Sequence, residues 1–95
     1  YADWCAACKE FEKLTFTDET VKANLSRFTK ARVDFTLLGE REQEIQQKYD
    51  IPGLPSLLFL RADGTEIREL RVEQFEPPDS FNKTLVKALR VLDGE

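Results

Sequence analysis

The two cysteines of this 95-residue chain, Cys5 and Cys8, stand at C-x-x-C spacing directly after a tryptophan. Two cysteines three positions apart can close a disulfide across one helical turn or supply half of a tetrahedral metal site. A tetrahedral site needs four ligands, and the chain has no histidine and no third cysteine. Redox chemistry is therefore the better interpretation, while a metal held between the cysteine pairs of two chains stays open.

The position of the pair suggests a different role for each thiol. A helix is expected to begin near Cys5, because Asp3 stands in a capping position and the run from Ala6 to Glu10 favours helix. Unpaired backbone N–H groups and the positive end of the helix dipole would stabilise a thiolate there. Cys5 is thus the predicted nucleophile, and the more shielded Cys8 the thiol that resolves a mixed disulfide. Two buried cysteines without chemistry would require the pair, its spacing and its place to be coincidences.

Glu12 is a third candidate for the site. It lies four residues after Cys8 and seven after Cys5, so it is expected on the same helical face as the thiols. Its carboxylate could raise their pKa by repelling a thiolate. The alternative is a solvated glutamate beside Lys9 and Lys13, and spacing alone ranks the two about equally.

Length and charge narrow the function classes. A chain of this size suits a single domain over residues 1–95. Its 18 acidic and 14 basic residues are scattered, with a net charge of −4, which gives no electrostatic footprint for nucleic acid. No apolar run approaches the ~20 residues that cross a bilayer, so no membrane insertion by this domain is expected. The start at Tyr1 rather than methionine suggests a fragment of a longer protein.

Periodicity predicts the elements that position these residues. Helices are expected at about 5–14, 19–25, 40–49 and from Pro77 onward, and strands at 31–37, 56–60 and 65–72. The first helix should bury Cys8, Phe11 and Leu14, and the last Phe81, Leu85, Leu89 and Leu92.

The predicted strands differ in how they should be buried. Residues 31–37 alternate apolar and polar, as in a strand with one buried face, whereas the unbroken apolar run after Pro55 suits a strand buried on both faces. An Asp-Gly turn at 63–64 makes 57–60 and 65–72 an antiparallel hairpin. A cis Leu54–Pro55 bond is a minority state, at about 5–6% of such bonds. The residues by themselves therefore favour a plain turn before the strand.

The predicted order of elements resembles the thioredoxin family, an α/β fold with a mixed sheet flanked by helices. The run YADWCAACKEFEK at 1–13, with Thr15–Asp18 and Gly53–Ser56, is most similar to the DsbD-like branch, the C-terminal periplasmic domains of transmembrane thiol:disulfide interchange proteins. Ordinary thioredoxins carry Gly-Pro where this chain has Ala6-Ala7. The resemblance implies that the central strand of the family would precede Tyr1 and is missing from this sequence.

The resemblance also implies a role for each matching position. Cys5 matches the exposed nucleophile and Cys8 the buried resolving cysteine, with Trp4 packed beside their disulfide. Glu12 matches an acidic residue that keeps the pKa of the nucleophile high.

A shallow groove for the partner's cysteine segment is implied as well. Pro55 matches a cis-proline opposite the thiols and forms one wall with Gly53 and Leu54. Trp4 and Ala6 form the other wall.

The function implied is that of a protein-disulfide reductase relay without cofactor or metal. Reduced Cys5 and Cys8 would reduce a partner disulfide and be re-reduced by a membrane-embedded domain of the same protein, another partner being a soluble redox domain. A monomeric, periplasmic domain of an inner-membrane protein is expected, with electron transfer toward cytochrome c biogenesis among its roles. The alternatives are a free-standing periplasmic reductase or isomerase and a non-catalytic thioredoxin-like binding module.

Overall fold

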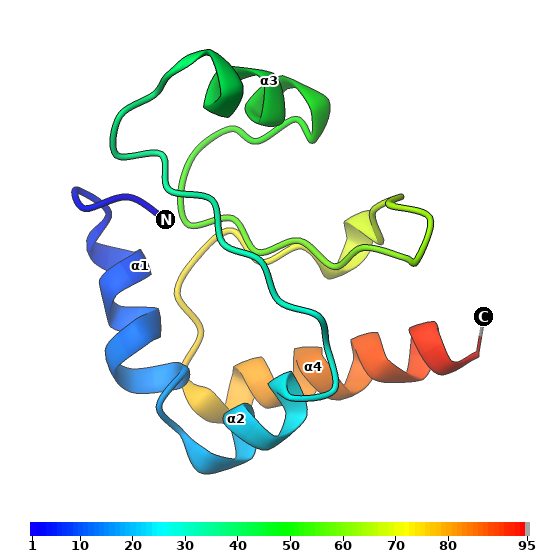
Figure 1. Ribbon diagram of the computed structural model, residues 1–95. Helices are drawn as coiled ribbons and strands as arrows, with labels where there is room; N and C mark the ends of the chain where they lie inside the picture. The colour runs from blue at the N-terminus through cyan, green and yellow to red at the C-terminus, as the bar shows by residue number, and fades with distance from the viewer. Residues whose placement is uncertain (95) are drawn as a thin grey trace.

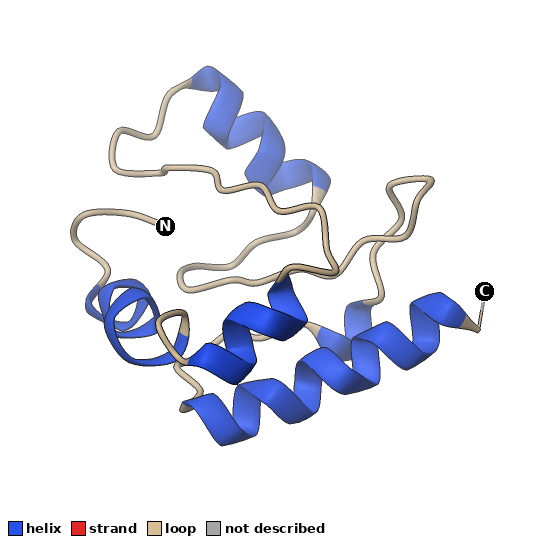
Figure 2. Ribbon diagram, turned by 60° about the horizontal axis from the view of Figure 1, so that its bottom comes forward, coloured by secondary structure: helices blue, strands red, loops and turns tan. Residues whose placement is uncertain are grey.

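The computed structural model describes residues 1–94 (Figure 1). Its helical elements in chain order are α1 (Ala6–Glu10), the π-helix η1 (Phe11–Thr15), α2 (Glu19–Leu25), α3 (Glu40–Lys48), the 3₁₀ turn η2 (Arg68–Leu70) and α4 (Pro78–Asp93). Extended segments run through the middle of the molecule, with α3 on one side and α1, α2 and α4 on the other (Figures 1 and 2). The four predicted helices are all present.

The first helix departs from its prediction in the second half. The Phe16 N–H donates to the Phe11 carbonyl at 2.7 Å, which is the i→i+5 bond of a π-helix. The wider turn moves Leu14 off the buried face, so that Leu14 is 55% exposed, and it buries Thr15 completely. The Thr15 hydroxyl donates to the Glu76 carbonyl at 2.6 Å, so no polar group is left unpaired there. The predicted apolar stripe is right at Phe11 and wrong at Leu14.

Helices α2 and α4 form as their end signals predict. The Asp18 carboxylate accepts a hydrogen bond from the Val21 N–H at 3.0 Å and caps α2. Pro78 occupies the first position of α4, where its missing N–H costs nothing. The two helices lie side by side (Figures 1 and 2) and bury one apolar face. The larger core cluster beneath them consists of Phe11, Val21, Phe59, Ile67, Leu70, Val72, Phe81, Leu85 and Ala88.

The segment predicted as a strand at 31–37 has an extended backbone, and it pairs through backbone hydrogen bonds with Tyr1. The Tyr1 backbone nitrogen donates to the Val33 carbonyl at 3.1 Å, and the Phe35 N–H to the Tyr1 carbonyl at 2.7 Å. That pattern is the pairing of parallel strands. Phe35 is buried as predicted, but the chain bends after it and Leu37 is 82% exposed. The prediction of one buried face is therefore right at Phe35 and wrong at Leu37.

The predicted hairpin is present as two antiparallel bridges, Leu57 to Val72 and Leu60 to Glu66. Gly64 turns the chain with a φ of +90°, a conformation that favours glycine. The turn η2 interrupts the second strand, so the pairing is not continuous. Phe59 is buried but Leu60 is 40% exposed, which corrects the prediction of a strand buried on both faces. The larger core cluster covers only one face of this segment.

Arg71, which is held in a buried ion pair, attaches the hairpin to the end of α3. The side chain of Arg71 is 3% exposed and pairs with Glu66, and it also donates to the carbonyls of Tyr49 and Asp50. Asp50 ends the α3 region with a φ of +53°, and its carboxylate accepts a hydrogen bond from Arg68 at 2.9 Å. These contacts fix the backbone immediately before the residues 51–55 that enter the candidate site.

Candidate active site

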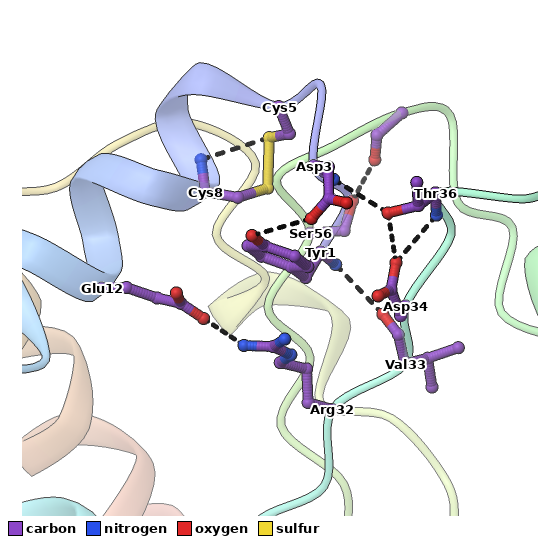
Figure 3. The surroundings of a disulfide bond; sticks show 11 residues. Tyr1, Asp3, Cys5, Cys8, Glu12, Arg32, Val33, Asp34, Thr36 and Ser56 are labelled. Atoms are coloured by element: carbon purple, nitrogen blue, oxygen red, sulfur yellow. Dashed lines mark hydrogen bonds and ion pairs between the residues drawn. A yellow bond between two sulfur atoms is a disulfide. The ribbon is translucent and has the colours of Figure 1, made fainter.

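Cys5 and Cys8 are joined by a disulfide, with their Cα atoms 5.3 Å apart (Figure 3). Cys5 is itself the N-cap of α1, because its backbone is extended and its sulfur accepts a hydrogen bond from the Cys8 N–H at 3.2 Å. The expected capping by Asp3 is wrong, since Cys5 caps the helix and the Asp3 carboxylate instead accepts a hydrogen bond from the Tyr1 hydroxyl at 3.2 Å. A backbone N–H aimed at the Cys5 sulfur can also stabilise a thiolate there after reduction.

The two cysteines are equally buried in this disulfide form. Cys5 is 5% and Cys8 7% exposed. The expectation of an exposed Cys5 and a more shielded Cys8 is therefore wrong for the oxidised state, because the bond to Cys8 holds the Cys5 sulfur against the first helical turn. Both cysteines belong to the smaller core cluster, with Ala2 and Phe35; Tyr1, Ala7, Val33, Ile45, Ile51 and Leu54 pack against it.

Hydrogen bonds tie the chain before Trp4 to the segment at 34–36. The Asp34 carboxylate accepts from the Thr36 hydroxyl at 2.6 Å and the Thr36 N–H at 2.8 Å, and these bonds hold the pKa of that carboxyl below its usual range. The same hydroxyl accepts from the Asp3 N–H. The backbone just before the cysteines is thus fixed in position.

The resemblance implied that Trp4 packs beside the disulfide, and in the structure Trp4 is 65% exposed. It lines a small cavity of about 90 Å³ together with Phe35, Leu38, Gln46, Ile51, Gly53 and Leu54. The cavity is mostly apolar. It lies between the residue before Cys5 and the residues before Pro55.

The segment at 53–55 forms one side of this cavity, in part as the resemblance implied. The Leu54–Pro55 peptide bond is cis, so the plain turn that the residues alone favoured is wrong. Leu54 packs against the smaller core cluster, Gly53 is exposed and Pro55 is buried. Trp4, Gly53 and Leu54 line the same cavity, whereas Ala6 is exposed and does not line it.

Glu12 is engaged in an ion pair that the sequence did not indicate. Its carboxylate, carried by η1, pairs with Arg32 from the segment at 31–37 (Figure 3). The guanidinium of Arg32 also lies over the Tyr1 ring, 4.0 Å from the ring centroid. Arg32 is twenty residues from Glu12 in sequence, and its signal was its place on the polar side of the alternating run.

Among residues 1–94, no group of three or more histidine, cysteine or carboxylate side chains is arranged to hold a metal ion. Of the helices in that part of the chain, none is long and apolar enough to cross a bilayer.

Three features define the class of thioredoxin-fold domains: a C-x-x-C disulfide at a helix start, a cis-proline, and both parallel and antiparallel backbone pairing. Residues 1–89 match the family model of the thioredoxin-like domain, and the chain belongs to this family. A thioredoxin from Thermus thermophilus covers all of the chain with a TM-score of 0.80 at 23% identity, which supports the fold alone.

Within the family, the chain is similar to proteins named thiol:disulfide interchange protein DsbD. It is 42% identical over 87 residues to that of Pectobacterium atrosepticum and 41% identical over 81 residues to that of Actinobacillus pleuropneumoniae. These matches cover 92% and 85% of this chain but only 15% and 14% of the relatives, so the chain spans about one seventh of their length.

Solved structures of a single domain give a fuller match. The C-terminal domain of Neisseria meningitidis DsbD is 27% identical, with a TM-score of 0.80, in both its reduced and its oxidised forms. The match covers 93% of this chain and 75% and 74% of those domains.

Proposed function

We propose that this chain is a thiol:disulfide interchange domain that passes electrons to protein disulfides through Cys5 and Cys8. The observation that carries the proposal is the Cys5–Cys8 disulfide at the start of α1, with the Cys8 N–H aimed at the Cys5 sulfur. The similarity to DsbD proteins over most of the chain supports the same chemistry.

In the proposed reaction, both thiols start reduced. The Cys5 thiolate attacks one sulfur of a partner disulfide, a new S–S bond forms, and the partner's other sulfur leaves as a thiolate that takes up a proton. The Cys8 thiolate then attacks the Cys5 sulfur and displaces the partner sulfur that was bonded to Cys5. This sulfur leaves as a thiolate and is protonated in turn. Two electrons have passed to the partner, and Cys5 and Cys8 end as the disulfide seen in Figure 3.

The partner segment is proposed to lie across the surface beside the disulfide. Trp4 on one side and Gly53 and Leu54 on the other border an apolar cavity that can receive a side chain near the partner's cysteine. Pro55 is proposed to support this wall from beneath, and Ala6 to contact the partner from the helix side. Glu12 is proposed to influence the protonation of the thiols.

The wider setting is also a proposal. The relatives are several times longer than this chain, which supports a domain that works with further redox domains of one protein. We infer that one of these is embedded in the inner membrane and re-reduces Cys5 and Cys8. A soluble periplasmic domain would then receive the electrons, and the domain itself would act as a monomer.

The proposal is tested by measuring the rate at which dithiothreitol reduces insulin disulfides in the presence and in the absence of the domain. The wild-type domain is expected to accelerate the reaction, and Cys5→Ser to return it to the uncatalysed rate. Reduced Cys8→Ser, mixed with insulin after the dithiothreitol has been removed, should accumulate a covalent adduct with the substrate through Cys5, visible by mass spectrometry. A Cys5→Ser domain that still forms the adduct would contradict the assignment of the nucleophile.

The direction of electron flow is tested by equilibrating the domain with glutathione. A reduction potential near the thioredoxin value of roughly −270 mV supports electron donation. A value near that of strong oxidants, about −120 mV, would exclude the reductase and indicate a disulfide donor.

A further inference from the structure

The Glu12–Arg32 ion pair belongs to a chain of side chains that passes below the disulfide (Figure 3). Arg32 pairs with Glu12 and lies over the Tyr1 ring, and the Tyr1 hydroxyl donates to the Asp3 carboxylate at 3.2 Å. We call these four residues, Glu12, Arg32, Tyr1 and Asp3, the charge chain. It joins the backbone just before Trp4 to the helix one turn beyond Cys8.

Arg32 has two fixed contacts within the charge chain. Its guanidinium is held by the Glu12 carboxylate and by the face of the Tyr1 ring. The Tyr1 ring is itself fixed relative to the segment that carries Arg32, because the Tyr1 backbone forms hydrogen bonds with both Val33 and Phe35. The guanidinium is therefore restricted, and with it the Glu12 carboxylate.

Other charged groups nearby in the described part of the chain make no ion pair with Glu12. The Tyr1 ammonium interacts electrostatically with Glu12, but it donates its hydrogen bond to the Val33 carbonyl. Lys9 and Lys13, on the same helical stretch as Glu12, are exposed and make no ion pair among residues 1–94. The Asp34 carboxylate is occupied by its two hydrogen bonds from Thr36. Arg32 is thus the cation that the described chain directs at Glu12.

We propose that Arg32 is a positioning residue for the exchange reaction. It holds the Glu12 carboxylate in the charge chain and weakens the repulsion between that carboxylate and a thiolate on the cysteine sulfurs. The inference rests on the proposed function of Cys5 and Cys8. Arg32 acts through Glu12 and does not touch the reacting atoms. Its contribution belongs to the reduced state, in which a thiolate forms.

The sign of the effect follows from the charges. Loss of Arg32 leaves the negative charge of the Glu12 carboxylate uncompensated, and this charge disfavours a thiolate, so the pKa of Cys5 rises. Loss of the Glu12 charge leaves the cation unopposed, so the pKa of Cys5 falls. Because the two side chains are 57% and 40% exposed, solvent screens the effect. A shift of about half a pKa unit, or about a threefold change in thiolate fraction below the pKa, is the expected size.

The experiment measures the rate of Cys5 alkylation by iodoacetamide against pH in the reduced domain, with the modified cysteine identified by peptide mass spectrometry. Arg32→Gln is expected to raise the Cys5 pKa by about half a unit, and Glu12→Gln to lower it. In the Glu12→Gln background, Arg32→Gln should shift the pKa less, because the carboxylate is gone. Arg32→Met, which keeps a stem over Tyr1, repeats the test if the glutamine variant does not fold.

Arg27→Gln is the matched control. Arg27 is also 57% exposed and also pairs with a carboxylate, that of Asp93 at 3.3 Å, but at the far end of α4. Its loss is expected to leave the alkylation profile unchanged. A wild-type profile for both Arg32 variants, or an equal Arg32 effect with and without Glu12, would overturn the inference. A wild-type domain that fails to reduce insulin overturns the proposed function instead.

Discussion

Single side chains set the geometry around the disulfide more than any extended sheet does. The Thr36 hydroxyl is the clearest case, since it donates to Asp34 and accepts from the Asp3 N–H, and so holds two chain segments at once. The Cys5 sulfur likewise is both half of the disulfide and the cap of its own helix. A substitution at either position is therefore expected to change the geometry around the two cysteines.

The Asp34 carboxyl gives a prediction about pH. Hydrogen bonds from Thr36 lower its pKa below the usual 3.8 in the folded state. A group with a lowered folded pKa stabilises the fold above its unfolded pKa, and this contribution is lost as the pH falls through the folded value. Thr36→Val removes the hydroxyl donor, so the Asp34 titration midpoint, followed by carboxyl carbon NMR, should rise toward 3.8. An unchanged midpoint would show that the backbone N–H alone sets it.

At the scale of elements, connections between distant segments hold the loop that enters the site. Arg71 and Glu66 are almost fully buried as a pair, and the Arg71 guanidinium also donates hydrogen bonds to the carbonyls at the end of α3. Arg68, three residues earlier, makes an exposed pair with Asp50. The two arginines therefore offer a direct comparison of buried and exposed ion pairs.

Arg71→Ala is expected to destabilise the domain by about 3–5 kcal/mol, because it leaves Glu66 as an uncompensated buried charge. Arg68→Ala should cost only about 0–1 kcal/mol, since its pair with Asp50 is solvated. Urea unfolding of the oxidised domain measures both. Equal losses would mean that burial of the Arg71 pair does not determine its contribution.

Local sequence patterns predict the helices well and the extended segments poorly. Helix hydrogen bonds are made within one segment, so capping signals such as Asp18 and the apolar face of α4 are enough. A strand needs partners from elsewhere in the chain. The alternation at 31–37 therefore gave the extended backbone but not its limits, and nothing local indicated the π-helical turn that exposes Leu14.

The candidate site shows the same division. The spacing of Cys5 and Cys8 identified the disulfide, because both residues lie in one turn. The cis peptide bond before Pro55 followed only from the family resemblance. Arg32 was missed because its contact with Glu12 depends on how two remote segments pack, which periodicity does not encode.

On the scale of the whole molecule, residues 1–94 are organised around two apolar clusters of different size. The larger core cluster contains a group of aromatic rings, in which Phe81 lies 5.6 Å from Phe11 and 5.8 Å from Phe16 between ring centroids. The smaller core cluster contains the disulfide and Phe35. The larger one packs α4 against α2 and η1 and is expected to dominate the free energy of unfolding.

Phe81→Ala should lower the free energy of unfolding by about 3–5 kcal/mol, because it removes a fully buried ring and its aromatic contacts. Val86→Ala, on the same helix but 39% exposed, should stay within about 0.5 kcal/mol of the wild type. Thermal and urea unfolding provide the measurement. A small loss for Phe81→Ala would show that the larger cluster does not dominate stability.

The separation of the two clusters bears on how such a domain can diverge. Substitutions beside Cys5, Cys8 and Phe35 can alter redox behaviour and partner choice while the packing beneath α4 keeps the chain folded. A mutational library confined to the smaller cluster should thus yield many folded variants with different reactivities. One confined to the larger cluster should yield few folded variants of any kind. Selection can then act on chemistry and on foldability at different positions of the same short sequence.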